Sequence, residues 1–456
     1  MLEFINKYIF GAAVPLLLIA AGIFYAIRLR AFHIFHPIRI VKALTRKNTA
    51  SGISPFRAVT LALAGTLGVG NIVGVSAAIG LGGFGAVFWM WISALCAMLL
   101  KYAEILLAIR HRRYDESGKP HGSAMYYIRD FFSSHSLPRI GKLLACVFAV
   151  LYIVNAVSMG SMIQSNAISE SMEGVFGIPP IICAAAVTLV CALLITKGTD
   201  AMAKFTEILV PIMTLGYIII SLAVLIMKRD MLSGAMAEIM RDALSPDSAA
   251  GGIIGFALSR SVRFGTMRGL VSNEAGCGTA PTAHAASNTT SAVEQGFWGI
   301  FEVFTDTIIL CTMTALVVIV NFGELKYRGS WIMLTIDAYS NLLGGAASVF
   351  LSVAVLCFGF ATIVCWAHYG IESAYYLSQR KLIKNAFIAV YCLSVFAGFL
   401  VAPDGIWTIA DFAIGAMTVI NVLTVCLMNK EVKLETDKYF TEKPNKKPKN
   451  AARKRI

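Results

Sequence analysis

Two sets of residues in this sequence could do chemistry inside otherwise apolar segments. The first is Gly65-Thr66-Leu67-Gly68-Val69-Gly70-Asn71-Ile72-Val73-Gly74, in which glycines and one asparagine interrupt an apolar run over about residues 58–80. Glycine is a poor helix former and allows close approach to the backbone. A membrane helix broken here would expose N–H and C=O groups, which are tolerated where they line a protected cavity and bind something. The Gly70-xxx-Gly74 spacing also fits close helix–helix packing, so both interpretations stand at this point.

The second set consists of carboxylates within a later apolar run. Asp306 lies about ten residues into the run 296–320, roughly 15 Å along a helix, and Glu302 lies one turn earlier on the same face. An ionisable group at that depth is costly and is by default a functional hypothesis. Asp306 is a candidate for holding a cation or taking up a proton, and a structural ion pair with a buried base is the alternative.

The composition indicates which elements position these residues. Hydrophobic residues make up 57% of the 456 and charged residues only 14%, against about 25% in an average soluble domain. The mean hydropathy is +0.72, and several apolar runs approach or exceed the roughly 20 residues that span a bilayer. We therefore expect an all-α polytopic membrane protein. The net charge of +13 is better explained by the orientation of basic loops than by nucleic-acid binding.

Other chemistries find little support. The sequence has no GxxxxGK[ST] motif for binding nucleotide phosphates, and its ten cysteines show no CxxC spacing and read as small apolar residues. No spacing gathers a nucleophile and a base, so we expect no enzyme and no cofactor. A channel would need rings of like residues around a pore, which the pattern does not indicate.

About eleven apolar runs are candidate membrane spans, the first read as a retained anchor and not a cleaved signal peptide. They cover about residues 8–27, 58–80, 86–109, 143–169, 178–196, 205–227, 249–265, 296–320, 346–377, 385–401 and 405–428. Alternate connections are basic, namely 28–57, 110–142, 197–204, 260–268, 380–384 and the tail. This asymmetry predicts an external N-terminus and a cytoplasmic C-terminus. It also places the polar run 268–281 on the cytoplasmic side.

The spans divide into two halves around a polar connection. The expected organisation is an extra helix and basic loop at 1–57, a five-helix repeat at 58–227, an extracellular connection at 228–248 with room for a short surface helix, a second repeat at 249–428, and a disordered basic tail at 429–456. Five spans per half give the halves opposite orientations, and each half begins with a glycine-interrupted span. Paired interrupted helices in inverted halves are the sequence pointer to the binding site of a secondary transporter, which favours the broken-helix interpretation of 65–74.

Several motifs resemble the alanine/glycine:cation symporter family over nearly the whole chain. They are Gly68-Val-Gly-Asn71-Ile-Val-Gly74, Gly82-Gly-Phe-Gly-Ala-Val-Phe88-Trp89-Met90-Trp91, Lys101-Tyr-Ala-Glu104, Gln164-Ser-Asn166, Arg268-Gly-Leu-Val-Ser-Asn273-Glu274-Ala-Gly-Cys-Gly278-Thr-Ala-Pro281, Gln295-Gly296, Asp306-Thr307 and Phe360-Ala-Thr362-Ile-Val-Cys-Trp366. Departures occur at His121-Gly-Ser-Ala124 and at Lys197-Gly-Thr-Asp200, both in expected cytoplasmic loops. The resemblance implies a LeuT-type 5+5 inverted repeat and sodium-coupled uptake of a small neutral amino acid across the plasma membrane.

The expected substrate is a zwitterion. Free N–H groups at a half-helix start suit its carboxylate, with Gly68 and Gly70 allowing close approach and Thr66 and Asn71 adding side-chain contacts. Carbonyl groups of either interrupted helix suit its ammonium. By resemblance, Gln164 is a further substrate contact. Trp366 is a candidate wall that limits the substrate side chain, with ordinary packing as its alternative.

The resemblance also implies a sodium site and a set of coupling residues. The sodium ligands carried over are the Thr362 hydroxyl and the carbonyls of Leu67 and Gly70. Glu104, Arg268 and Glu274 are expected in gate or loop contacts. The full set of coupling or gating candidates is Glu104, Arg268, Asn273, Glu274, Glu302 and Asp306.

Some alternatives stay open at this level. Coupling to protons through Asp306 or Glu302 competes with coupling to sodium. Alanine, glycine and glutamine all remain candidate substrates. A monomer with an inverted repeat is sufficient for transport in the lipid bilayer, while the oligomeric state is not readable from the sequence.

Overall fold

Long apolar helices form the body of the structure, a computed structural model that describes residues 2–45, 52–244, 259–327 and 329–441. In these ranges, seven helices are long and apolar enough to cross a membrane, or eight if one bent pair counts as a single span. They are α7 (Gly85–Arg110), α9 to α10 (Pro138–Phe176), α12 (Thr199–Met227), α18 to α19 (Ala292–Val320), α21 (Gly345–Leu377), α22 (Lys381–Gly398) and α23 (Asp404–Leu427). Two shorter apolar helices, α2 (Gly11–Arg28) and α11 (Pro180–Thr196), match further predicted spans. The prediction of an all-α polytopic membrane protein is confirmed.

The glycine-rich stretch breaks its helix, as predicted. Helix α5 (Pro55–Thr66) begins at Ser54, whose hydroxyl accepts a hydrogen bond from the Arg57 N–H, and it ends before Gly68. A short 3₁₀ turn, η2 (Val69–Asn71), leads into α6 (Val73–Gly82), and the two parts of the span are bent by 56°. A Cβ added at Gly74 would meet no atom within 4 Å. The Gly70-xxx-Gly74 pair is therefore not a tight packing face at Gly74.

The described part of the second half also contains a broken helix. Helix α16 (Arg260–Asn273) ends at Glu274, and α17 (Ala280–Ala285) follows. Glu274 has φ +53°, a left-handed conformation that costs energy in a residue other than glycine. The predicted span 249–265 lies largely outside the described residues.

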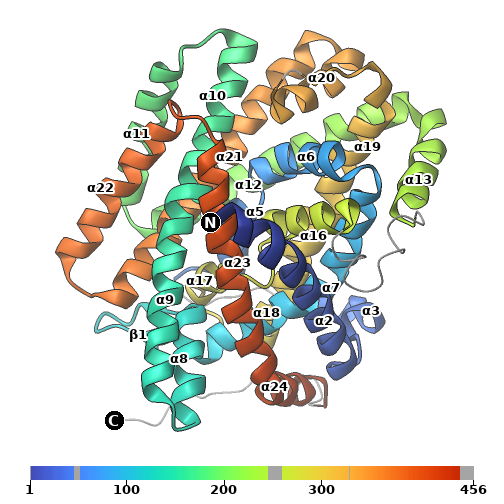
Figure 1. The fold of residues 1–456 in the computed structure, drawn as a ribbon. Helices are drawn as coiled ribbons and strands as arrows, with labels where there is room; N and C mark the ends of the chain where they lie inside the picture. Colours follow the sequence, from blue (N-terminus) through green and yellow to red (C-terminus); the bar gives the residue numbers. More distant parts are fainter. Residues whose placement is uncertain (1, 46–51, 245–258, 328, 442–456) are drawn as a thin grey trace.

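One prediction about this region was wrong. Residues 260–268, expected as a basic loop, form the first turns of α16. The polar run 268–281, for which a place on the cytoplasmic side stays a prediction, is largely buried at the break. Its polar side chains form hydrogen bonds with one another and with α18–α19. A hydropathy pattern does not distinguish such buried polar residues from those of a solvated loop. Figure 1 shows α16 in the middle of the bundle.

π-helical turns interrupt two of the long spans next to these breaks. The turn η3 (Ser158–Met162) joins α9 (Pro138–Val157) to α10 (Ile163–Phe176), and η4 (Phe304–Cys311) joins α18 (Ala292–Val303) to α19 (Thr312–Val320). A third, η1 (Ile5–Phe10), precedes α2. Such turns occur frequently at functional sites.

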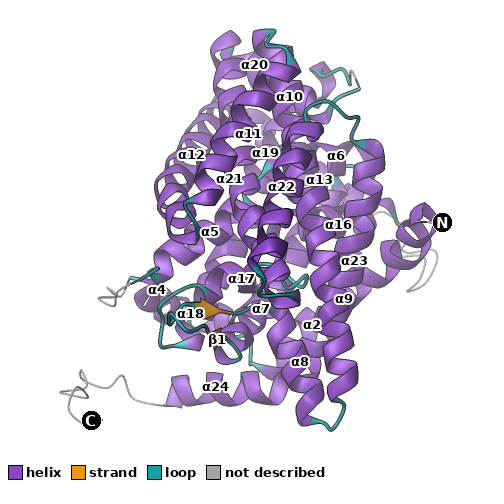
Figure 2. Cartoon of the chain, turned by 90° about the vertical axis from the view of Figure 1, so that its left-hand side faces the viewer, coloured by secondary structure: helices purple, strands orange, loops and turns teal. Residues whose placement is uncertain are grey.

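Shorter helices cover the two ends of the bundle (Figure 2). At one end lie α20 (Trp331–Leu343) and α13 (Arg229–Ala243), the surface helix for which the polar connection had room. The remaining short elements are α1 (Leu2–Phe4), α3 (Phe32–Phe35), α4 (Pro37–Leu44), α8 (Ala124–Ser134), η5 (Phe322–Glu324) and the antiparallel pair β1 (Arg113–Tyr114) with β2 (Pro120–His121), in register Arg113 to His121.

The prediction that the whole tail is disordered was wrong. Residues Asn429–Thr441 form α24, which lies across the opposite end of the bundle from α20. Val432 and Thr436 are buried, one turn apart, and the Thr436 hydroxyl pairs with the Tyr102 hydroxyl at 2.7 Å. Disorder was predicted because the segment is highly charged, and composition alone does not reveal that one face of a charged helix is buried. Residues 442–456 lie outside the described residues.

Candidate functional site

The two breaks meet at one buried carboxylate. Asn71 Nδ2 donates to Asp306 Oδ1 at 2.7 Å, and the hydroxyls of Ser272 and Thr307 donate to Asp306 Oδ2, each at 2.7 Å. Asp306 is fully buried and Asn71 is 3% exposed. The carboxylate thus ties the α5–α6 break to the end of α16 and to the turn η4. Because Asp306 receives three hydrogen-bond donors, it is arranged as an acceptor for protein groups.

This arrangement fixes the orientation of the Asn71 amide. Its NH₂ group must face Asp306, since the carboxylate only accepts hydrogen bonds. The Asn71 Oδ1 atom is then left buried with no hydrogen-bond partner in the structure. A buried acceptor without a donor costs free energy, which a ligand with N–H groups would recover.

A second cluster joins the α5 break to α10 and α21. A Cβ at Gly68 would lie 2.6 Å from Thr362 Oγ1 and 3.0 Å from Gln164 Oε1. Gln164 is 4% exposed; its Oε1 accepts from the Val69 N–H at 3.2 Å and its Nε2 donates to the Met159 carbonyl at 3.2 Å. Gln164 is therefore bonded to the break itself, and only glycine fits at position 68.

Thr362 sits among backbone oxygens where a cation site was expected. Its Oγ1 lies 2.8 Å from the Ala64 carbonyl oxygen and 3.0 Å from the Phe358 carbonyl oxygen. The structure brings α21 to the C-terminal end of α5, as the predicted site requires. A Cβ at Gly70, by contrast, would face Ser272 and Val271 of α16, with nearest atoms at 3.7 and 3.9 Å.

Trp366 is fully buried on the same face of α21 as Thr362. Trp366 packs so closely on η3 that a Cβ added at Gly160 would lie 2.4 Å from its ring. The Trp366 ring also makes edge contacts with the rings of Tyr152 and Tyr369, at centroid distances of 5.8 and 5.4 Å. Its indole Nε1 has no hydrogen-bond partner in the structure. The residue closes the region beside the α5 break with an aromatic surface.

A buried ion pair supports both breaks from the side of α7. Lys101 Nζ donates to Glu302 Oε1 at 2.7 Å and to the Asn273 carbonyl at 2.6 Å, and both charged side chains are fully buried. Glu302 Oε2 lies 3.2 Å from His284 Nε2, and Thr66 Oγ1 lies 3.4 Å from Glu302 Oε1. Glu302 thus forms an ion pair with a buried base. The sequence analysis gave such a pair as the alternative to a functional role for the carboxylates of the run 296–320.

Glu104 and Glu274, expected in gate or loop contacts, are both fully buried beside the connection between α16 and α17. Asn421 Nδ2 donates to Glu104 and, at 2.9 Å, to the Gly276 carbonyl, so α23 is bonded to the α16–α17 break. The Thr279 hydroxyl donates to Glu274 Oε2 at 2.6 Å. Their polarity reflects the interior network of the break and not a surface loop.

Asn273 and Arg268 occupy different surroundings. Asn273 Nδ2 donates to Thr307 at 3.1 Å and its Oδ1 accepts from the Ala275 N–H at 3.0 Å, so it shapes the break. Arg268 lies away from this network, with its guanidinium 4.7 Å from the centroid of the Trp407 ring.

Sequence reasoning missed several partners. Ser272 and Thr307 were quoted only as parts of motifs, and Ala64 and Asn421 carry no local signal. Cys365 and Tyr369 face Gly65, whose added Cβ would lie 2.9 Å from Cys365 Sγ and 3.2 Å from the Tyr369 hydroxyl. Their spacing from Thr362 and Trp366 marks one helical face and was the available signal.

Comparison with known proteins identifies relatives over nearly the full length of the chain. The model of the sodium:alanine symporter family matches residues 1–454. The chain is 33% identical to the sodium/alanine symporter AgcS of Methanococcus maripaludis, covering 98% of each chain. It is 32% identical to the probable sodium/glutamine symporter GlnT of Bacillus subtilis, over 96% of this chain and 90% of that one.

The fold has counterparts among solved structures. MhsT, crystallised in complex with L-phenylalanine, aligns with a TM-score of 0.58 over 86% of this chain and 99% of its own, at 13% sequence identity. At that identity the match establishes a shared fold, the LeuT-type arrangement expected from the inverted halves.

Proposed function

The chain belongs to the sodium:alanine symporter family, and we propose that it takes up a small neutral amino acid together with sodium by alternating access. It is a multi-pass membrane transporter and not an enzyme. We place it in the plasma membrane, with the N-terminus outside and the C-terminus in the cytoplasm, because the basic loops other than 260–268 keep their alternation.

One observation carries the proposal. Asn71 Oδ1 is a buried acceptor without a partner at the point where the two broken helices meet. The ammonium of an amino acid supplies the missing donor. Its carboxylate then lies toward the N–H groups of Gly70 and Asn71, which open a helical segment and have no carbonyl earlier in that segment to bond. Thr66, Gly68 and Gln164 line the same break.

Sodium binds, in this proposal, between α5 and α21. The Thr362 hydroxyl and the Ala64 carbonyl are already within 2.8 Å of each other, and the free end of α5 adds the carbonyl of Leu67. Hard cations take several such oxygen ligands. A Cβ added at Gly70 would face α16 and not Thr362. In this proposal Gly70 therefore contributes to the substrate site more directly than to the sodium site around Thr362.

The size of the substrate follows from the aromatic surface beside the break. In this proposal, Trp366 with Tyr152 and Tyr369 restricts the space for the side chain of the substrate, which favours alanine and glycine. Glutamine is the alternative, because the chain is similar to GlnT at 32% identity.

Proton coupling is the second candidate mechanism. The contact of Lys101, Glu302 and His284 places titratable groups between the two breaks, and Asp306 links the breaks directly. In the leading proposal these groups, with Asn273, Glu104 and Glu274, transmit movement between the helices and keep their protons throughout the cycle.

Uptake into proteoliposomes tests the function. Labelled alanine, glycine and glutamine are offered with an inward sodium gradient or an inward proton gradient, one at a time. We expect accumulation of alanine or glycine with sodium alone, and its loss in Asn71→Ala. Accumulation driven only by protons would overturn the coupling ion, and no accumulation of any of the three would overturn the substrate class.

A further inference from the structure

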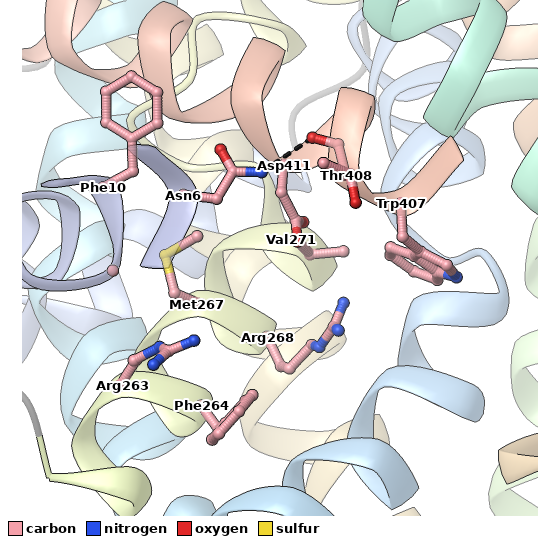
Figure 3. A pocket seen from close by; sticks show the side chains of 11 residues that line it. Asn6, Phe10, Arg263, Phe264, Met267, Arg268, Val271, Trp407, Thr408 and Asp411 are labelled. Carbon is pink, nitrogen blue, oxygen red and sulfur yellow. Dashed lines mark hydrogen bonds between the residues drawn. The ribbon is translucent and has the colours of Figure 1, made fainter. Parts of the chain in front are cut away.

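A cavity lined by both charged and apolar side chains lies beside α16 (Figure 3). It has a volume of about 260 Å³ and lies between η1, α16 and α23. We call it the outer pocket and define it by Asn6, Arg263, Met267, Arg268, Trp407 and Asp411. Drug-sized ligands occupy pockets of roughly 300–1,000 Å³, so this volume suits a smaller molecule.

Three charged side chains face the outer pocket without pairing. In the part of the chain that the structure describes, neither the Arg263 nor the Arg268 guanidinium has a carboxylate oxygen within 4.0 Å, and Asp411 has no cationic nitrogen within that distance. Arg268 rests on the Trp407 ring at 4.7 Å and Arg263 on the Phe264 ring at 5.0 Å. All three are half-buried. Two partly desolvated guanidiniums rest on aromatic rings with a carboxylate near them but beyond 4.0 Å, an arrangement that suits a ligand with charges of both signs.

A further unpaired polar atom lies at the same wall. Asn6 Nδ2 donates to the Thr408 carbonyl at 2.9 Å, which leaves Asn6 Oδ1 buried with no hydrogen-bond partner in the structure. This atom points away from the charged side chains (Figure 3), so the pocket offers a ligand two cationic groups and one carboxylate. A simple anion would pair with the guanidiniums but leave Asp411 without a cationic partner. A zwitterion pairs with both kinds of charge.

The outer pocket is separated from the central site by one turn of backbone. Val271 lines the pocket, and the next residue, Ser272, donates to Asp306. The Val271 carbonyl and Ser272 Cα also approach the Cβ position of Gly70 at 3.9 and 3.7 Å. A shift of the end of α16 would therefore connect the two sites.

We propose that the outer pocket is a second, staging site for an α-amino acid, with the carboxylate held by Arg263 and Arg268 and the ammonium held by Asp411. The assignment rests on the proposed function, which supplies the class of ligand. In the orientation proposed above the pocket faces the outside, so it captures the substrate before it reaches Asn71. Sodium is not needed for this step, because neither Thr362 nor Ala64 lines the outer pocket.

Trp407 provides a direct readout. Alanine is titrated into purified Asn71→Ala protein, in which the central site is disabled, and tryptophan emission is recorded without sodium. We expect a saturable change that disappears in Asn71→Ala/Trp407→Phe. Adding Arg268→Gln should raise the half-saturating alanine concentration about tenfold or more, the loss expected for a charged hydrogen bond. Arg260→Gln is the matched control, because Arg260 is an exposed arginine on the same helix outside the pocket, and it should leave the titration unchanged.

The ligand class is tested with single-charge probes. Acetate and ethylammonium should each bind more weakly than alanine. Acetate binding as tightly as alanine, with no effect of Asp411→Asn, would overturn the zwitterion site, and so would the absence of any saturable change in Asn71→Ala. Should Asn71→Ala fail to fold, the same titration of the wild-type protein in sodium-free buffer replaces it. Failure of the proposed function is a separate result: the wild-type protein would then show no gradient-driven uptake of alanine, glycine or glutamine.

Discussion

Removing the negative charge of Asp306 tests whether this carboxylate orients the Asn71 amide. In Asp306→Asn the Oδ1 acceptor for the Asn71 amide is kept, but the hydrogen bond loses its charge. Charge-assisted hydrogen bonds, worth roughly 1.5–3 kcal/mol, are about twice as strong as neutral ones. The loss of about half that value should raise the KM for alanine roughly threefold to tenfold. Asp306→Ala removes the acceptor altogether and should raise KM by about 10- to 150-fold.

The reciprocal substitution has a sharper signature. Asn71→Asp places a second carboxylate 2.7 Å from the Asp306 oxygen, and two carboxylates this close are stable when they share one proton. The protonated form reproduces the donor of the asparagine amide and leaves one oxygen for the substrate. Uptake by Asn71→Asp should therefore be present at low pH and lost at high pH, a dependence absent in wild type. The double variant N71D/D306N restores one donor and should remove the pH dependence.

The assay is initial-rate uptake of labelled alanine into proteoliposomes with equal internal and external pH and an imposed sodium gradient. Membrane insertion of each variant is checked by the amount reconstituted. Parallel pH profiles of Asn71→Asp and wild type would refute the reasoning, as would a wild-type KM in Asp306→Ala. Proton coupling would be favoured instead if a proton gradient drives alanine uptake by the wild-type protein and Asp306→Asn alone abolishes the pH dependence of that uptake.

Three further outcomes are expected. Thr362→Ala should raise the sodium concentration for half-maximal alanine uptake severalfold, because it removes one oxygen ligand; an unchanged sodium dependence would take Thr362 out of the cation site. Gly68→Ala should abolish uptake while the protein still inserts, because its Cβ would lie 2.6 Å from Thr362 Oγ1; normal uptake would contradict the close approach of α5 and α21. His111 lies between Asp130 and Glu431 of α24, and although burial lowers its pKa, hydrogen bonds to both carboxylates outweigh burial and raise it to about 9. The stabilisation of α24 should be complete below about pH 6.5 and fall as pH rises through about 9, measured by hydrogen exchange of α24, and His111→Gln should remove this dependence; pH-independent exchange in the wild-type protein would count against the contact.

The main elements of the fold were predictable from local sequence. Apolar runs located most of the spans because the bilayer demands a fixed length of apolar helix. The break at 65–74 was predictable because glycine weakens a helix wherever it occurs. The break between α16 and α17 was not predicted, since its signal is a polar run, and polar residues bonded to one another in the interior look the same in sequence as residues in a loop.

The candidate site was predictable residue by residue but not as a set of contacts. Asn71 and Asp306 were each singled out, yet their hydrogen bond joins residues 235 positions apart, and nothing local encodes that pairing. The same holds for Glu104 with Asn421. Thr362 was carried over from the family resemblance, whereas the carbonyl beside it, that of Ala64, depends on how far α5 continues before it breaks.

Flux of labelled sodium in response to the amino acid tests the central claim most directly. Proteoliposomes with labelled sodium outside are compared with and without external alanine, for wild type and for Asn71→Ala. The account predicts that alanine accelerates sodium entry in wild type and has no effect in Asn71→Ala. Sodium entry that ignores alanine, glycine and glutamine in wild type, or amino-acid accumulation that a proton gradient alone sustains, would contradict it.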